Sequence, residues 1–189
     1  MKRVGILGGT FDPPHLGHLI IAEEVKLALD LDEVWFIPTN EPPHKKKANT
    51  HVHERINMLE IATQSNSAFH INAMETERLG KSYTFDTMNM LTDKHPTTSF
   101  YFIIGGDMVE YLPKWHRIEE LTELVTFVGV ARTGYSLASS YPITRVEVPL
   151  IDISSTMIRQ RLENHKTVHY LIPSEVYTHI KERRLYEDK

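Results

Sequence analysis

The chain contains 189 residues, of which 21 are Lys or Arg and 25 are Asp or Glu, so its formal net charge is −4. This length suits one domain with an ordinary core, and a charged fraction of 24% argues against disorder along the whole chain. The lack of cysteine excludes disulfides, iron–sulfur clusters, cysteine-bound zinc and a thiol nucleophile.

Neither the charge nor the hydrophobic pattern indicates a nucleic-acid or membrane partner. The mild acidity argues against a protein that wraps nucleic acid over its whole surface. The longest strongly apolar run, residues 100–104, is far shorter than the ~20 residues of a membrane-spanning helix. The apolar stretch near the start stops at Gly8 and is too short for a secretion signal. We therefore expect a soluble, cytoplasmic protein.

Short apolar runs that predict buried strands alternate with segments of helical length. In chain order, the pattern predicts a strand at 3–7, a helix at 16–29, a strand at 34–37, a loop at 38–50, a helix at 52–63, a strand at 69–71, a helix at 85–91, a strand at 99–104, a helix at 118–124, strands at 125–130 and 145–148, and helices at 156–162 and 175–184. Such alternation is typical of parallel strands joined by crossover helices. We predict a single α/β domain over residues 1–189 with a doubly wound, mainly parallel sheet.

Two of the predicted strands end in a similar way. The first leads into Gly8 and Gly9, and the strand at 99–104 leads into Gly105, Gly106 and Asp107. In doubly wound sheets, ligands bind beyond the carboxyl ends of the strands, where the strand order reverses. Glycine lets the backbone approach a ligand closely, and an acid after it can accept hydrogen bonds from ribose hydroxyls. If these strands are neighbours, they frame one nucleotide site; alternatively, the glycine pairs only form tight turns.

The segment 8–18, which reads GGTFDPPHLGH, carries the strongest chemical signal. Its two prolines fix the backbone of a turn that enters a helix. His15 and His18 are three residues apart, so both face one side of the first turn, where free N–H groups and the helix dipole favour anions. Gly17 would leave room for a ligand between them. The pattern favours a phosphate site over the alternative, a capped helix with two satisfied histidines.

A second helix start has matching chemistry. Ser154 or Ser155 would cap the helix that begins near residue 156. Their hydroxyls and the free N–H groups would contact phosphate, and Arg159 in the first turn could bind it through two nitrogens. On its own this pattern is that of an ordinary capped helix. Together with the first motif, it predicts two helix N-termini directed at one polyphosphate.

These two segments resemble the signatures of the HxGH nucleotidyltransferase superfamily, the second signature being Ile153–Arg159. Within the superfamily, the chain resembles the bacterial nicotinate-nucleotide adenylyltransferases. Four further segments carry this resemblance: Pro42–Lys45, Ser82–Thr87, Gly105–Asp107 and Leu112–Trp115. The matches run in the expected order from residue 4 to about residue 160. The resemblance implies a Rossmann-like nucleotidyltransferase fold.

The resemblance also implies an activity and a set of site residues. The reaction would join ATP and nicotinate mononucleotide to give the dinucleotide and pyrophosphate, a step of NAD biosynthesis. The implied catalytic residues are His15, His18 and Arg159. The implied ATP-binding residues are Gly8, Gly9, Thr10, Phe11, Gly105, Asp107, Ser154 and Ser155. The implied residues for the acceptor nucleotide are Lys45, Tyr83, Thr84, Trp115 and Arg132. Mg²⁺ would be carried by the ATP phosphates with no protein metal site, and a homodimer is left open.

Residue chemistry is compatible with a pyridine nucleotide as the acceptor. The indole of Trp115 could stack on the pyridine ring, or it could simply anchor a loop. The backbone N–H groups of Tyr83 and Thr84 precede a predicted helix and could bind the nicotinate carboxylate, which predicts preference for the acid over the amide. Lys45, on the 38–50 loop, could reach the mononucleotide phosphate. Arg132 is a weaker phosphate candidate.

Several alternatives agree less well with the sequence. The related branch that adenylylates phosphopantetheine typically has Thr at the position of His15. The cytidylyltransferase branch usually carries an Arg-Thr-x-Gly-Ile-Ser-Thr-Thr motif, whereas Pro149–Asp152 precede the second signature here. A nucleotide sensor without turnover is disfavoured by the intact histidine pair. The histidines at 44, 51 and 53 lack a carboxylate at ligand spacing, so no metal site is predicted there.

Overall fold

The computed structural model describes residues 1–40, 48–78, 80–131 and 134–187. In these residues, six strands form one sheet in which every neighbouring pair is parallel. The strands are β1 (Lys2–Gly9), β2 (Glu33–Pro38), β3 (Phe69–Ile71), β4 (Thr98–Gly105), β5 (Thr126–Val130) and β6 (Ile143–Val146). Their spatial order is β3-β2-β1-β4-β5-β6, so the order reverses between β1 and β4. The predicted doubly wound sheet is confirmed, and the two strands with glycine pairs are neighbours at its switch point.

The helices follow the predicted ranges closely. They are α1 (Leu16–Ala28), α2 (Val52–Thr63), α3 (Thr84–Lys94), α4 (Gly106–Tyr111), the 3₁₀ turn η1 (Leu112–Lys114), α5 (Ile118–Leu124), α6 (Ser155–Glu163) and α7 (Ser174–Glu182). Helix α4 and η1 were not expected, because the glycines at 105 and 106 were interpreted as the end of a strand. The last strand also lies two residues earlier than expected, since Ile143 and Val146 rather than Val148 pack beside β5.

The side chains of the central strands alternate between two apolar layers. In β4, Phe100, Phe102 and Ile104 belong to a cluster with α3, α4 and α5. Ile103 points to the opposite face, into a cluster that contains Ala22 of α1 and Leu59 of α2. A sheet that is buried on both faces needs apolar residues at successive positions, which explains why these strands appear as continuous apolar runs in the sequence.

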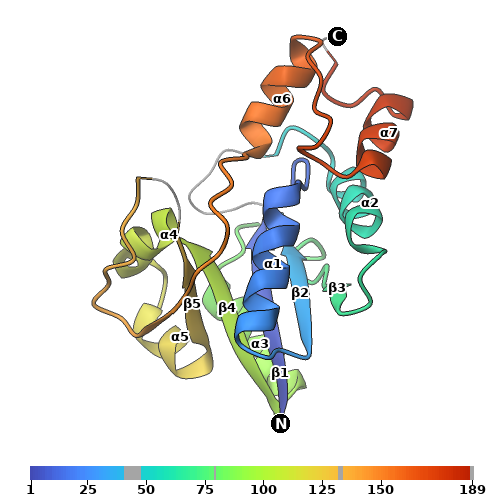
Figure 1. Cartoon of the computed structure of the whole chain (residues 1–189). Coiled ribbons are helices and arrows are strands. Elements are labelled where there is room, and N and C mark those ends of the chain that lie inside the picture. The colour runs from blue at the N-terminus through green and yellow to red at the C-terminus, as the bar shows by residue number, and fades with distance from the viewer. Residues whose placement is uncertain (41–47, 79, 132–133, 188–189) are drawn as a thin grey trace.

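A third apolar cluster joins α2 to the C-terminal helices. It contains Met58 of α2, Ile158 of α6 and Val176 of α7, each fully buried. Figure 1 shows α6 and α7 gathered beside α2 at the end of the molecule opposite the N-terminus, the end toward which β1 runs. This packing carries residues 155–187 to the edge of the sheet where the carboxyl ends of the strands lie. Among the described helices, none is both long and apolar enough to cross a bilayer.

Candidate active site

A cavity of about 790 Å³ lies at the switch point between β1 and β4. Among the residues implied by the resemblance, those that line it are Gly8, Gly9, Thr10, Phe11, His15, His18, Thr84, Gly105, Asp107, Trp115, Ser154, Ser155 and Arg159. Tyr83 is not among the lining residues, although it caps the helix that Thr84 begins. Lys45 and Arg132 lie outside the described residues. The structure therefore brings together side chains from both halves of the sheet and from the C-terminal third of the chain.

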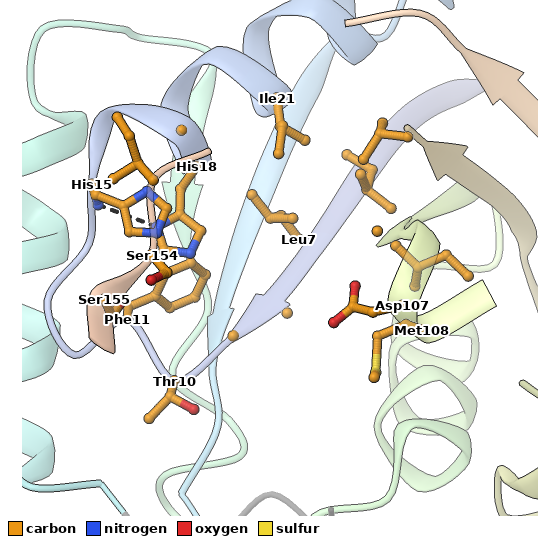
Figure 2. A pocket seen from close by; sticks show the side chains of 18 of the residues that line it. Leu7, Thr10, Phe11, His15, His18, Ile21, Asp107, Met108, Ser154 and Ser155 are labelled. Atoms are coloured by element: carbon orange, nitrogen blue, oxygen red, sulfur yellow. Dashed lines mark hydrogen bonds between the residues drawn. The ribbon is translucent and has the colours of Figure 1, made fainter. Parts of the chain in front are cut away.

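The two signature histidines form a stacked pair on one side of the cavity. His15 is the N-cap of α1, with an extended backbone, and His18 lies in the first turn. Their ring centroids are 3.6 Å apart, and the backbone N–H of His15 donates to Nδ1 of His18 at 3.2 Å. The Phe11 ring meets the edge of His18 at a centroid distance of 4.9 Å. Figure 2 shows these three rings beside Ser154 and Ser155, with Asp107 and Met108 across the cavity.

The hydrogen bond between the two histidines fixes the tautomer of His18. Because Nδ1 of His18 accepts a hydrogen bond, it carries no proton, and the neutral ring must then carry its proton on Nε2. His15 is only 7% exposed. The pair is therefore held by the backbone and by stacking before any ligand arrives, and it offers an N–H donor from His18.

Three glycines of the site make room for side chains two residues away. A Cβ on Gly9 would lie 3.0 Å from the Phe11 ring, and one on Gly105 would lie 2.8 Å from Oδ1 of Asp107. A Cβ on Gly17 would lie 3.0 Å from Nδ1 of His15. Gly17 thus leaves space for the imidazole of the protein itself, and because it also lines the cavity, the predicted space for a ligand beside it stays a prediction.

Substituting Gly17 by alanine should therefore separate stability from activity. Alanine is favoured over glycine inside a helix by about 1 kcal/mol, so the melting temperature should stay unchanged or rise. The added methyl group would push the His15 ring away from its stacked position, and kcat should fall by roughly tenfold. Thermal unfolding and steady-state turnover measure the two effects. Lys26→Ala in the same helix is the control, and equal activity of G17A and the unaltered chain would contradict the steric argument.

The start of α6 is tied to the segment before α1. The Ser154 hydroxyl accepts from the backbone N–H of Met157 at 3.2 Å and so acts as the predicted N-cap. The Ser155 hydroxyl donates to the carbonyl of Pro13 at 2.8 Å. Arg159 donates from Nη1 to the carbonyl of Asp12 at 2.7 Å. Both groups that were expected to contact phosphate thus also hold the signature segment, which leaves Arg159 only part of its guanidinium for a ligand.

The first turns of α1 and α6 differ in the N–H groups they leave for an anion. In α1, the N–H of Leu16 donates to the carbonyl of Leu171 at 3.0 Å, and Gly17 retains an N–H with no acceptor inside the helix. In α6, the first two amides, those of Ser155 and Thr156, likewise have no acceptor inside the helix. Both predicted helix N-termini are present beside the cavity, α1 with fewer N–H groups for a ligand than expected, and anion binding at these ends stays a prediction.

The acceptor side of the cavity contains buried polar atoms beside the start of α3. Trp115 and Thr84 line it, together with Ser82, which the sequence analysis did not single out. Among the described residues, the Ser82 hydroxyl and Nε1 of Trp115 are buried and make no hydrogen bond. Buried donors without a partner are unfavourable, so a ligand that accepts hydrogen bonds here would be bound favourably.

A buried carboxyl also lines this part of the cavity. Glu75 is 7% exposed and accepts a hydrogen bond from the Thr87 hydroxyl at 2.7 Å. Burial raises the pKa of the Glu75 carboxyl, and the bond from Thr87 and the charge of Arg78 only partly offset this. The lining of the cavity therefore includes a carboxyl that burial drives toward its neutral form, besides His15, His18 and Arg159.

One buried cation beside the site was not predicted from the sequence. Arg55 of α2 is 1% exposed and donates from Nη1 to the carbonyls of Thr10 at 2.6 Å and Thr39 at 2.9 Å. Burial lowers the pKa of its guanidinium, whereas the negative charge of Asp12 raises it. The sequence contains a usable signal, because Arg55 falls on the apolar face of α2, one turn before Met58. A charged residue on an apolar face indicates a buried polar role.

Among the described residues, no three His, Asp or Glu side chains are grouped so that they could hold a metal ion. The Asp107 carboxylate lines the cavity from the first turn of α4, across from the histidines (Figure 2). The delivery of Mg²⁺ on ATP stays a prediction.

The strand order, with a histidine pair, a serine-capped helix and an aspartate around one switch-point cavity, defines an α/β nucleotidyltransferase. In agreement, the sequence pattern of the Cytidylyltransferase-like family matches residues 6–161. The fold is similar to that of the nicotinic acid mononucleotide adenylyltransferase of Plasmodium falciparum, which was solved in complexes with NaAD and with APC. The NaAD complex gives a TM-score of 0.84 at 22% identity, and the APC complex gives 0.83 at 21%; each match covers 98% of both chains.

Bacterial relatives place the chain more narrowly. A probable nicotinate-nucleotide adenylyltransferase of Oceanobacillus iheyensis is 57% identical over 186 residues, covering 98% of this chain and 97% of the relative. One of Bacillus cytotoxicus is 56% identical over 188 residues, covering 99% of this chain and 100% of the relative. The chain belongs to the nicotinate-nucleotide adenylyltransferase family.

Proposed function

We propose that this chain transfers the adenylyl group of ATP to nicotinate mononucleotide, which gives nicotinate adenine dinucleotide and pyrophosphate. The observation that carries the proposal is the stacked pair of His15 and His18, which lines the same cavity as Asp107 and Trp115 at the switch point. One cavity thus has donors for phosphate, an acceptor for ribose hydroxyls and an aromatic surface for a second base. The family assignment supports the same reaction.

The reaction needs positioning and charge neutralisation more than proton transfer. An oxygen of the mononucleotide 5′-phosphate forms a bond to the α-phosphorus of ATP, and the bond from that phosphorus to the bridging oxygen breaks to release pyrophosphate. The second pKa of such a phosphate is about 6, so the nucleophile is already ionised near neutral pH. Catalysis then rests on in-line alignment and on donors directed at the charge that develops.

The tautomer that the hydrogen bond selects for the neutral His18 ring supports this role. Its Nδ1 is taken by the backbone N–H of His15, so Nε2–H is the group that would donate to an oxygen of the α-phosphate. His15 and Arg159 would act on the β- and γ-phosphates. The Gly17 amide and the first two amides of α6 add backbone donors, and the dipoles of both helices favour the negative charge.

The remaining ATP contacts come from the two ends of the paired strands. Asp107 would accept hydrogen bonds from the adenosine ribose, while Gly8, Gly9 and Gly105 bring backbone close to the nucleotide. Mg²⁺ would be bound by the ATP phosphates, where it neutralises negative charge.

The acceptor nucleotide would occupy the side of the cavity near α3. The Trp115 indole packs edge-on against Phe102 and Phe127 at centroid distances of 5.9 and 6.0 Å, which fixes the plane on which a pyridine ring would stack. The N–H groups of Tyr83 and Thr84 and the buried Ser82 hydroxyl would bind the nicotinate carboxylate. Lys45 and Arg132, outside the described residues, stay candidates for the mononucleotide phosphate.

Pyrophosphate release tests the proposal directly. With ATP and Mg²⁺, we expect turnover with nicotinate mononucleotide and at least about tenfold lower kcat/KM with nicotinamide mononucleotide, since a neutral amide gains less from charge-assisted hydrogen bonds. A reaction without acceptor is the control. Absence of release with the acid would refute the reaction, and a faster rate with the amide would refute the carboxylate contacts.

We further propose the cytoplasm, where ATP is available, as the location of this protein. A homodimer stays a prediction.

A further inference from the structure

Asp12 joins three separate parts of the chain immediately before the histidine pair. Its carboxylate is buried, with the residue 3% exposed. Oδ1 accepts a hydrogen bond from the Tyr186 hydroxyl at 2.6 Å, and Oδ2 accepts one from the backbone N–H of Asn49 at 2.8 Å. Its carbonyl accepts from Arg159 at 2.7 Å. Every one of these donors is far away in the sequence, so the position of Asp12 depends on tertiary contacts rather than on its own turn.

Tyr186 is held in place by an unusual backbone after α7. Two residues after α7 ends, Arg184 is in the left-handed region at φ 50°. The N–H of Leu185 then donates to the carbonyl of Ile180 at 3.0 Å, which closes the helix end. Tyr186 itself has φ 62°, a conformation that is unfavourable for a bulky residue. Strained residues persist where the surrounding structure holds them, and they concentrate at functional sites. Here the strained turn directs the phenol to Oδ1 of Asp12.

The Tyr186 hydroxyl is a permanent donor. Burial and the adjacent Asp12 carboxylate raise the pKa of the phenol above its ordinary value, so it stays protonated wherever the protein is folded. A buried carboxylate oxygen that lost this donor would be left without one hydrogen bond, which is costly. Asp12 would then rotate or draw in water, and the segment leading to the histidines would follow.

We propose that Tyr186 is a positioning residue for adenylyl transfer, acting through Asp12 on the segment that carries His15 and His18. This inference rests on the proposed function for its catalytic readout. Asp12 lies three residues before His15, and Pro13 between them is fixed through its carbonyl by Ser155. Displacement of catalytic groups by a fraction of an ångström lowers the rate without removing any atom that touches a substrate.

The test is Tyr186→Phe, which removes one oxygen and keeps the packing against the third apolar cluster. We expect kcat to fall by roughly tenfold, with KM for ATP and for the acceptor changed by less than about threefold, because no substrate contact is lost. Tyr177→Phe is the matched control, since Tyr177 packs against the same cluster and its ring contacts His169. A kcat of Y186F within twofold of the unaltered chain would overturn the proposal.

A double-mutant cycle asks whether Tyr186 acts through Asp12. If it does, adding Y186F to Asp12→Asn should lower kcat much less than Y186F alone does, because the hydrogen bond is already altered. Additive losses would overturn the proposed route. Imidazole ¹⁵N chemical shifts provide a readout without turnover: the His18 signals should move in Y186F and stay in place in Tyr177→Phe. Unmoved His18 signals would overturn the positioning role of Tyr186. Because this readout needs no turnover, it separates a failure of the positioning role from a failure of the proposed adenylyl transfer.

Discussion

Replacing His18 by alanine is expected to lower kcat by about 10²–10³-fold with the fold retained. The magnitude is that of removing one preorganised donor to a developing oxyanion. The proposed role suits His18, because Nδ1 accepts from the backbone N–H of His15 and the neutral ring then carries its proton on Nε2, the nitrogen proposed to donate to the α-phosphate. The substitution also removes the stacking partner of His15. Pyrophosphate release at saturating ATP and nicotinate mononucleotide measures the effect, and near-ultraviolet circular dichroism reports on the fold.

A matched control for this variant is His53→Ala. His53 is exposed at the start of α2 and does not line the cavity, so its loss should leave kcat near that of the unaltered chain. Turnover of H18A within threefold of normal would refute the assigned role of His18. Equal losses in both variants would indicate a general effect of removing imidazoles rather than the loss of one donor.

Replacing Arg55 by methionine is expected to lower the free energy of unfolding by about 3–5 kcal/mol, the usual cost of removing one member of a buried polar and charged group. The methionine would fill much of the space, but the carbonyls of Thr10 and Thr39 would lose their charged donor. The buried Asp12 carboxylate would lose a stabilising positive charge nearby. Urea-induced unfolding followed by tryptophan fluorescence measures the change.

Two further variants sharpen the Arg55 experiment. Arg145→Met removes an exposed arginine of β6 and should change stability by less than about 0.5 kcal/mol. Arg55→Lys keeps a cation but loses the planar fork, so an intermediate loss is expected. If R55M were as stable as R145M, the two hydrogen bonds to strand-end carbonyls would not contribute as argued.

Most of the scaffold could be predicted because its signals are local. Continuous apolar runs identified the parallel strands, and Ser154 identified the start of a helix that it caps in the structure. The glycine-ended strands suggested the switch point, which the pairing of β1 with β4 confirms. Helix α4 was missed because a glycine such as Gly106 usually indicates the end of a strand. In the structure, Gly106 instead makes room for Tyr135, since a Cβ added at Gly106 would lie 2.9 Å from the Cβ of Tyr135.

The support around the site could not be predicted in the same way, because its contacts join residues that are distant in sequence. Tyr186 and Asp12 are 174 positions apart, and neither the tyrosine nor the turn before it has a pattern that indicates the other. The reason for Gly17 depends on the rotamer of His15, which no sequence pattern reports. Arg55 is the exception, since a cation on the apolar face of a helix is visible in the sequence.

The hydrogen bonds from Ser155 to Pro13 and from Tyr186 to Asp12 join the signature segment to residues that are synthesised late. Translation proceeds at about 5–20 residues per second, so the signature segment leaves the ribosome roughly 10–30 s before the tyrosine that holds it is even made. The sheet can assemble during that interval, since β1 to β6 end at residue 146. Through most of its synthesis the nascent chain therefore lacks the hydrogen bond from Tyr186 to Asp12, so the proposed positioning of the histidines would be completed last.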